Sequence, residues 1–152
     1  MNIILFEPEI PTNTGNIGRS CVAVGAKLHL IKPLGFFIDD KSLKRAGMDY
    51  WHDLDVRIYE GFDDFVKQNN NPRIFMVETG ADKLYTEVEY KSDDFIMFGK
   101  ETTGIPNEIL SKYKNTIVRI PMIAGTRSLN LSNAAAIVLF EALRQTGFEG
   151  LG

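Results

Sequence analysis

The sequence contains a single cysteine, Cys21, and only two histidines, His29 and His52. One cysteine excludes an intramolecular disulfide and any metal site built from several thiolates. No group of His, Asp and Glu has the spacing of metal ligands, so we expect no metal. Cys21 falls on an apolar helix face and His29 inside an apolar strand, which predicts a core position for both. A chain without disulfides fits a reducing compartment, and a cytoplasmic location is expected.

Long apolar runs and an excess of positive charge are missing as well. No stretch approaches the roughly 20 residues that cross a membrane, and the first residues lack the basic start of a signal peptide, so no membrane partner is expected. A net charge of −3 argues against binding nucleic acid by bulk electrostatics, but it leaves a local basic patch open. At 152 residues and 44% hydrophobic content, residues 1–152 are expected to form a single domain.

Short apolar runs predict the strands of a sheet. Most are continuous rather than alternating, as expected for strands that are covered on both faces. The predicted strands are Ile3–Phe6, Leu28–Ile31, Val56–Tyr59, Ile74–Val77, Phe95–Phe98 and Ile117–Ile120. The helices predicted between them are Asn16–Val24, Lys41–Ala46, Phe62–Gln68 and Asn107–Lys114. This alternation indicates an α/β fold with a mostly parallel sheet and helices on both faces.

The last predicted helix, Leu131 to Thr146, is apolar around most of its circumference. A helix that packs on one face of a sheet needs only an apolar stripe. Two interpretations remain, deep burial inside one domain or burial by a second subunit. In a chain of this size we favour a homodimer.

The stretch "NTGNIGR", Asn13 to Arg19, follows the first predicted strand and suggests a phosphate-binding turn. The dinucleotide fingerprint needs three glycines, but only Gly15 and Gly18 are present and Asn13 stands in the place of the first. The second strand ends "LHLIKP", without an acidic residue to hold a ribose. The "GRS" at Gly18–Ser20 lacks the spacing of a Walker loop. Both nucleotide motifs are therefore excluded, and a polar turn with an exposed Arg19 is the plain structural interpretation.

Two further polar stretches follow later strands. They are "FGKETTGIP", Phe98 to Pro106, and "RIPMIAGTRSLNLSNAAA", Arg119 to Ala136. All three stretches leave the carboxyl ends of predicted strands, where open α/β sheets bind ligands. Together they predict one site assembled from distant parts of the chain.

With these three motifs, and with "HLIKPLGF" and "KRAGMDYW", the sequence resembles the SPOUT-class RNA methyltransferases along essentially its whole length. The resemblance is greatest to the minimal TrmL (YibK-like) enzymes, which methylate the ribose 2′-hydroxyl at the wobble position of tRNA. It implies a tRNA (cytidine/uridine-34) 2′-O-methyltransferase with a C-terminal trefoil knot and an obligate homodimer. It also implies S-adenosylmethionine as the methyl donor and a tRNA anticodon loop as the partner. Methyl transfer from a sulfonium needs no metal.

The resemblance also implies roles for individual residues. Arg19 would engage the attacking ribose hydroxyl, with Asn13, Glu101 and Asn130 in supporting catalytic positions. Because arginine has a pKa above about 12, it is a poor general base. Arg19 would therefore position the hydroxyl, stabilise negative charge or need a phosphate to take the proton, and the sequence does not choose among these. The methyl-donor pocket would be lined by Val77, Gly99, Ile120, Ser128 and Leu129.

Contacts with RNA are open to two interpretations. In "KSLKRAGMDYW" basic residues precede an aromatic pair, Tyr50 and Trp51, which suits phosphate binding and base stacking. The same stretch also fits a solvated helix face and a packed aromatic pair. The basic candidates are Lys41, Lys44 and Arg45 there, and Arg119, Arg127 and Arg144 near the expected dimer interface. Alternative functions are methylation of another RNA such as rRNA, or an inactive RNA-binding module, which the intact Arg19, Glu101 and Asn130 argue against.

Overall fold

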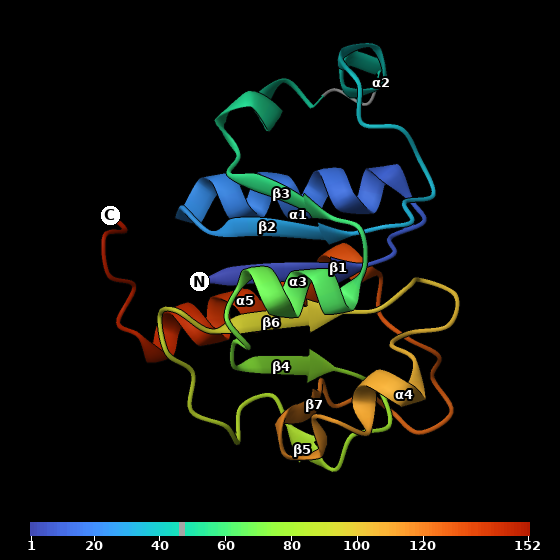
Figure 1. The fold of residues 1–152 in the computed structure, drawn as a ribbon. Helices are drawn as coiled ribbons and strands as arrows, with labels where there is room; N and C mark the ends of the chain where they lie inside the picture. The colour runs from blue at the N-terminus through green and yellow to red at the C-terminus, as the bar shows by residue number, and fades with distance from the viewer. Residues whose placement is uncertain (46–47) are drawn as a thin grey trace.

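The computed structural model describes residues 1–45 and 48–152. Its centre is a seven-stranded sheet in the order β3–β2–β1–β6–β4–β7–β5, in which every strand pair is parallel (Figure 1). The strands are β1 Asn2–Phe6, β2 Lys27–Ile31, β3 Val56–Tyr59, β4 Ile74–Val77, β5 Lys83–Leu84, β6 Phe95–Phe98 and β7 Ile117–Arg119.

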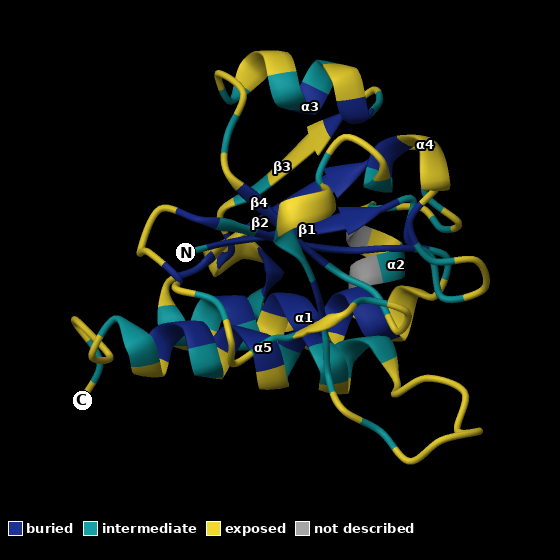
Figure 2. Cartoon of the chain, turned by 90° about the horizontal axis from the view of Figure 1, so that it is seen from below, coloured by how far each residue is buried: buried dark blue, intermediate teal, exposed yellow. Residues whose placement is uncertain are grey.

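Helices cover both faces of this sheet, which confirms the predicted fold class (Figure 2). One face carries α1 Pro11–Val24 and α5 Leu131–Gln145, which lie side by side. The other carries α3 Phe62–Gln68 and α4 Asn107–Leu110. The helix α2 Asp40–Arg45 and two 3₁₀ helices, η1 Asp49–Asp53 and η2 Lys114–Thr116, complete the elements.

The central strands are apolar without alternation because each supplies two cores. In β1 all five residues are buried. Ile3 and Leu5 pack into the core under α1 and α5, whereas Ile4 and Phe6 pack into the core under α3. Successive side chains of a strand point to opposite faces, so a strand covered on both sides needs apolar residues at every position.

The helix α1 begins at Pro11, five residues before the predicted start at Asn16. Pro11 suits this position because its fixed φ matches a helix and its missing N–H is not needed in the first turn. Gly15 and Gly18 therefore lie inside a helix and not in a loop. A Cβ on Gly15 would collide with the Met48 side chain, and one on Gly18 would lie 3.1 Å from Leu54 Cδ2. The two glycines let residues 48–54 pack against α1. This agrees with the exclusion of the nucleotide motifs, and it corrects the polar-turn interpretation, because the stretch is the first part of a helix.

Other boundaries differ from prediction by smaller amounts. The strand predicted as Ile117–Ile120 ends at Arg119, and the helix predicted as Asn107–Lys114 divides into α4 and η2. The strand β5 was not predicted. The helix predicted as Lys41–Ala46 corresponds to α2, with Ala46 outside the described residues.

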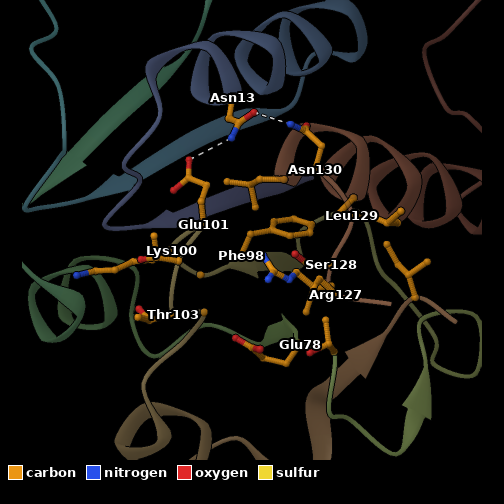
Figure 3. A pocket seen from close by; sticks show the side chains of 18 of the residues that line it. Asn13, Glu78, Phe98, Lys100, Glu101, Thr103, Arg127, Ser128, Leu129 and Asn130 are labelled. Carbon is orange, nitrogen blue, oxygen red and sulfur yellow. Dashed lines mark hydrogen bonds between the residues drawn. The ribbon is translucent and has the colours of Figure 1, made fainter. Parts of the chain in front are cut away.

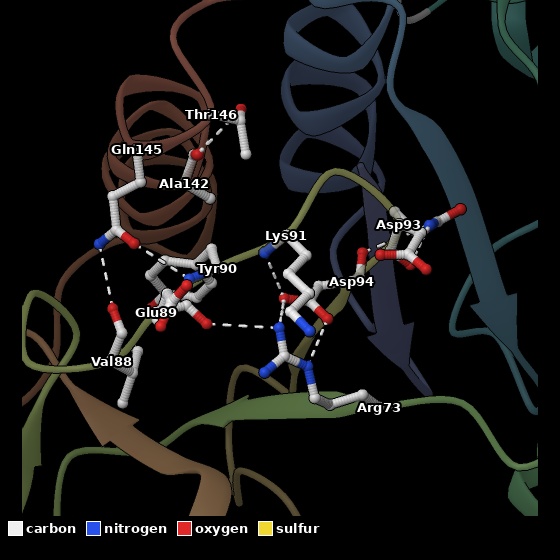
Figure 4. Close-up of polar contacts among 11 residues, drawn as sticks. Arg73, Val88, Glu89, Tyr90, Lys91, Asp93, Asp94, Ala142, Gln145 and Thr146 are labelled. Atoms are coloured by element: carbon white, nitrogen blue, oxygen red, sulfur yellow. Dashed lines mark hydrogen bonds and ion pairs between the residues drawn. The ribbon is translucent and has the colours of Figure 1, made fainter.

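The C-terminal end of α5 is tied to the segment that precedes β6 (Figure 4). The Gln145 side chain accepts a hydrogen bond from the Tyr90 amide at 3.0 Å and donates one to the Val88 carbonyl at 3.1 Å. In the same segment the buried Asp94 carboxylate accepts two hydrogen bonds from Arg73, at 2.7 and 2.5 Å. Residues 88–94 thus connect the last helix to the start of β4.

Across the part of the chain that the structure describes, no helix combines the length and the apolar character needed to cross a bilayer. The trefoil knot implied by the resemblance stays a prediction.

Candidate functional site

A pocket of about 630 Å³ lies at the carboxyl ends of β1, β6, β4 and β7, which are neighbours in the sheet (Figure 3). The chain places β2 and β3 on one side of β1 and all later strands on the other. A ligand site is expected where the strand order reverses in this way. Eight of the nine predicted site residues line the pocket: Asn13, Val77, Gly99, Glu101, Ile120, Ser128, Leu129 and Asn130.

Glu101 holds the start of α1. Its carboxylate accepts hydrogen bonds from the amides of Glu9 at 2.9 Å and Ile10 at 3.1 Å, and from Asn13 Nδ2 at 3.3 Å. The N-cap residue Ile10 has no side-chain cap of its own, and its amide is held by a residue 91 positions away. A carboxylate is also favoured there by the helix dipole. These contacts make Glu101 an anchor for α1.

Asn13 and Asn130 extend this connection to α5. Asn130 Nδ2 donates to Asn13 Oδ1 at 3.0 Å. Asn130 Oδ1 caps α5, because it accepts hydrogen bonds from the amides of Ser132 at 2.9 Å and Asn133 at 3.4 Å. The resulting chain of side chains, Glu101–Asn13–Asn130, joins the loop after β6 to the first turns of both helices. We call it the polar relay.

Two further contacts fix the loop after β6 against the segment after β1. The Glu9 carboxylate accepts hydrogen bonds from the Thr102 amide at 3.1 Å and the Thr102 hydroxyl at 2.9 Å. Lys100 Nζ lies 2.6 Å from the Glu7 carboxylate. Together with the contacts of Glu101, these interactions fix residues 100–102 against residues 7–13.

Two glycines shape the loop that forms one wall of the pocket. A Cβ on Gly99 would overlap the Gly104 carbonyl carbon, and Gly104 has a φ of +69°, which favours glycine. Lys100 and Gly104 exchange two backbone hydrogen bonds, of 3.2 and 2.9 Å. These contacts show that both glycines are needed for the tight turn of this loop.

Glu78 lines the same pocket and was missed by the sequence analysis. Its carboxylate accepts a hydrogen bond from the Ile105 amide at 2.5 Å. Burial raises the pKa of Glu78, against the opposing effect of hydrogen bonds from the amides of Ile105 and Thr79. A signal was present in "FMVE", where an acidic residue directly follows a buried strand.

Arg19 is the predicted site residue that does not line the pocket. It is exposed on α1, six residues beyond Asn13, a spacing that turns it to a different side of the helix. Its guanidinium carbon lies 6.0 Å from the centre of the Tyr50 ring, and the Tyr50 hydroxyl donates to the Gly15 carbonyl. The structure therefore separates Arg19 from the residues predicted to hold the donor.

The candidates for RNA contact differ in how accessible they are. Trp51 is 6% exposed and packs over Gly18, so the packed aromatic interpretation holds for it. Tyr50 is half-buried. Among the basic candidates, Lys41, Lys44 and Arg45 are exposed, Arg127 lines the pocket, Arg119 is half-buried and Arg144 pairs with Glu141 at 2.8 Å.

Cys21 and His29 lie in the core, as predicted. Burial raises the pKa of the Cys21 thiol to about 12, which makes it a poor nucleophile. Burial, with a smaller effect of Arg57, lowers the pKa of His29 to about 4. Over residues 1–45 and 48–152 no group of three or more His, Cys, Asp and Glu is arranged to hold a metal ion.

Comparison of the sequence places the chain among RNA methylases. Residues 1–140 match the model of the SpoU rRNA Methylase family. A tRNA (cytidine(34)-2′-O)-methyltransferase from Saccharophagus degradans is 49% identical over 150 residues, which cover 98% of this chain and 97% of that protein. The tRNA (cytidine(34)-2′-O)-methyltransferase of Escherichia coli K12 is 44% identical over 151 residues, which cover 99% and 96%.

Solved structures agree. A crystal structure from Bacillus anthracis, 44% identical, has a TM-score of 0.94 and covers 99% of this chain and 96% of that one. A structure described as giving insights into the 2-OH methylation of C/U34 on tRNA is 37% identical, with a TM-score of 0.89 and coverage of 96% and 95%. An AdoMet-bound rRNA methyltransferase from Sinorhizobium meliloti is 28% identical, with a TM-score of 0.80, and this chain covers 55% of it. Since the family model matches most of the chain and both sequence relatives match it nearly end to end, the chain belongs to the SpoU rRNA methylase family.

Proposed function

We propose that this chain is a tRNA 2′-O-methyltransferase that transfers a methyl group from S-adenosylmethionine to the ribose of cytidine or uridine 34 in the anticodon loop. The observation that carries the proposal is the pocket, which gathers predicted donor-binding and catalytic residues from positions 13 to 130. The relatives named for cytidine 34 support the choice of RNA and nucleotide. The AdoMet-bound relative supports the choice of donor.

The residues that line the pocket fit this donor. Its volume lies within the roughly 300–1,000 Å³ of small-molecule sites. Val77, Ile120 and Leu129 supply apolar surface for the nucleoside, and Gly99 and Ser128 supply backbone groups and a hydroxyl for its polar edges. When bound, S-adenosylmethionine supplies an electrophilic methyl group on a sulfonium.

The proposed roles of the other residues follow from where they lie. The polar relay holds the pocket loop and the starts of α1 and α5 in one arrangement, which positions the donor for transfer. Because Arg19 lies outside the pocket lining, its proposed role is toward the acceptor RNA. There it would orient the 2′-hydroxyl and stabilise the negative charge that develops on it.

We further propose that residues 1–152 form a single catalytic domain that works as a homodimer in the cytoplasm. Support for the dimer comes from α5, which buries one side in its own chain and leaves Ile137 and Phe140 exposed on the other. A substrate tRNA supports the location.

The experiment measures labelled methyl transfer into tRNA and identifies the methylated nucleoside by mass spectrometry. We expect 2′-O-methylation of nucleotide 34. Arg19→Ala should lower the rate about 10²–10³-fold, as removal of a transition-state hydrogen-bond donor does. Donor binding should be unchanged, because Arg19 does not touch the pocket. Arg19→Lys should also fail, since a point charge does not reproduce the planar guanidinium.

Three outcomes would contradict parts of the proposal. Methylation of rRNA but not tRNA would overturn the substrate. Absence of both donor binding and transfer in the wild-type protein would favour an inactive RNA-binding module. An Arg19→Ala protein that methylates at the wild-type rate would remove Arg19 from the mechanism.

A further inference from the structure

Glu78 lines the pocket with a carboxylate that is not part of the polar relay. It follows the last residue of β4, and its amide donates to the Val118 carbonyl of β7 at 2.9 Å. This contact fixes its backbone at the carboxyl end of the strands. The side chain turns into the pocket, where Figure 3 shows it beside the loop after β6.

The protein groups around this carboxylate use only part of its hydrogen-bond acceptor sites. Oε1 accepts from the Ile105 amide at 2.5 Å. A Cβ on Gly104 would lie 2.7 Å from Oε1 and 3.0 Å from Oε2, so the carboxylate lies against the bare Cα of this glycine. An ionised carboxylate has about four lone-pair sites, and the amides of Ile105 and Thr79 occupy only part of them.

The carboxylate also has no cation beside it. Among the described residues, none places a basic nitrogen within 4.0 Å of Glu78. A half-buried carboxylate whose acceptor sites are only partly used is costly, and a ligand that donates further hydrogen bonds to it offsets the cost. Burial already raises its pKa in the absence of such a ligand.

The position of Glu78 selects the part of the donor that it meets. In Figure 3, Asn13 and Asn130 of the polar relay lie at one end of the pocket and Glu78 at the other, with Phe98 and Ser128 between them. Under the proposed function the supporting catalytic residues Asn13, Glu101 and Asn130 lie at the relay end, so the reacting methyl group faces that end. The nucleoside then extends toward Glu78, while Arg127 in the same lining offers a cation for the carboxylate of the amino-acid part.

We propose that Glu78 is a donor-binding residue whose carboxylate accepts hydrogen bonds from the ribose hydroxyls of S-adenosylmethionine. This assignment rests on the proposed function. Dinucleotide-binding folds use an acidic residue at a strand end for the same purpose. The second strand of this chain lacks such a residue, and β4 supplies it instead.

The test compares ligands that differ by one group. Calorimetry measures the affinity of wild-type and Glu78→Gln proteins for S-adenosylhomocysteine, its 2′-deoxy and 3′-deoxy analogues, and 5′-methylthioadenosine, which lacks the amino-acid part. Glutamine keeps an oxygen for the Ile105 amide but loses the charge, and charge-assisted hydrogen bonds are about twice as strong as neutral ones. Glu78→Gln should bind S-adenosylhomocysteine and methylthioadenosine about tenfold more weakly. The preference for S-adenosylhomocysteine over at least one deoxy analogue should shrink by the same factor.

The control is Glu87→Gln, which changes an exposed carboxylate that caps the Leu84 amide outside the pocket and should alter none of these affinities. If Glu78→Gln does not fold, Glu78→Asp keeps the charge, moves it back by one methylene and should lose the same discrimination.

An equal loss for all four ligands would show that Glu78 only clamps the loop, and would overturn the proposal. A loss for S-adenosylhomocysteine without one for methylthioadenosine would assign Glu78 to the ammonium group, and would also overturn it. A wild-type protein that binds none of the ligands would remove the proposed function itself.

Discussion

His29 illustrates how a buried polar residue is satisfied in this fold. It is 1% exposed, with Nδ1 2.8 Å from the Tyr59 hydroxyl and Nε2 3.2 Å from Asn2 Oδ1. Asn2 Nδ2 donates to the carbonyls of Asp93 and Asp94, which orients its amide and leaves Oδ1 as an acceptor. The neutral ring therefore donates from Nε2 and accepts from Tyr59 at Nδ1. A protonated ring carries a hydrogen on both nitrogens, so Nδ1 could no longer accept the hydrogen bond from Tyr59.

The pH dependence of stability should show this preference. The pKa of His29 is about 4 in the fold, against 6.5 for a solvent-exposed histidine, because burial, and then Arg57, disfavour the charge. The unfolded chain binds the proton first, so stability is highest above pH 6.5 and falls as the pH drops toward 4. The loss is on the order of 3 kcal/mol. Urea unfolding at pH 7.5, 6 and 5 measures the free energy of unfolding of the wild-type and His29→Gln proteins, and the difference between them isolates the effect of His29. The raised pKa of Glu78 has the opposite effect, but it is common to both proteins and cancels in the difference. Parallel curves for the two proteins would contradict this account.

Single residues were predictable where their chemistry depends on a local pattern. Cys21 and His29 were placed in the core because their neighbours in sequence are apolar. Glu78 was missed because its importance depends on Gly104 and Ile105, which only the fold brings to it. The pocket residues were identified through the resemblance, since no spacing within the chain connects Asn13 to Asn130.

At the scale of elements, Asn130 acts both as the cap of α5 and as the partner of Asn13, and substitutions can separate the two functions. Asn130→Asp keeps the acceptor for the Ser132 amide but loses the N–H that reaches Asn13. Its charge also suits a helix N-terminus. We expect its stability to stay within about 0.5 kcal/mol of wild type, whereas Asn130→Ala should lose about 1 kcal/mol. Both should lower methyl transfer roughly tenfold to a hundredfold, because the pocket loops are no longer held together.

Urea unfolding and labelled-methyl incorporation on the same three proteins check this prediction. If Asn130→Asp transfers methyl groups like the wild type, then Asn130 serves only as a cap, and the polar relay is not part of the active arrangement.

The elements themselves were predictable to the extent that their signals are local. β4 and β6 match their predicted bounds because continuous apolar runs mark strands that are covered on both faces. β3 also matches its predicted bounds, although it is an edge strand in which Arg57 and Ile58 are exposed. The start of α1 was placed too late because Ile10 gives no capping signal, and Glu101, which holds the Ile10 amide, lies far along the chain. β5 has two residues, too few for any periodicity to show.

At the scale of the whole molecule, the path of the last segment could not be predicted from local patterns. β7 lies near one edge of the sheet, yet α5 returns to pack beside α1 and β6. Neither propensity nor periodicity encodes such a crossing, and the knot was expected only through the resemblance. What the sequence pattern of α5 does encode is an apolar surface larger than one chain covers.

That excess surface leads to the last prediction, which concerns assembly. In a single chain Phe140 is 46% exposed on the outer side of α5, whereas Ala135 is 3% exposed on the inner side. Phe140→Glu should therefore fold, because its charge reaches water in the monomer. It should not dimerise, because an unpaired buried charge costs several kcal/mol. Sedimentation at low micromolar concentration should give twice the 17.1 kDa chain mass for the wild type and the single mass for Phe140→Glu, with matching circular dichroism.

Two further variants are controls. Ala135→Glu should instead unfold the chain, and Phe148→Glu, past the end of α5, should stay dimeric. A wild-type protein that is monomeric and active at this concentration would show that the outer face of α5 is not a subunit interface.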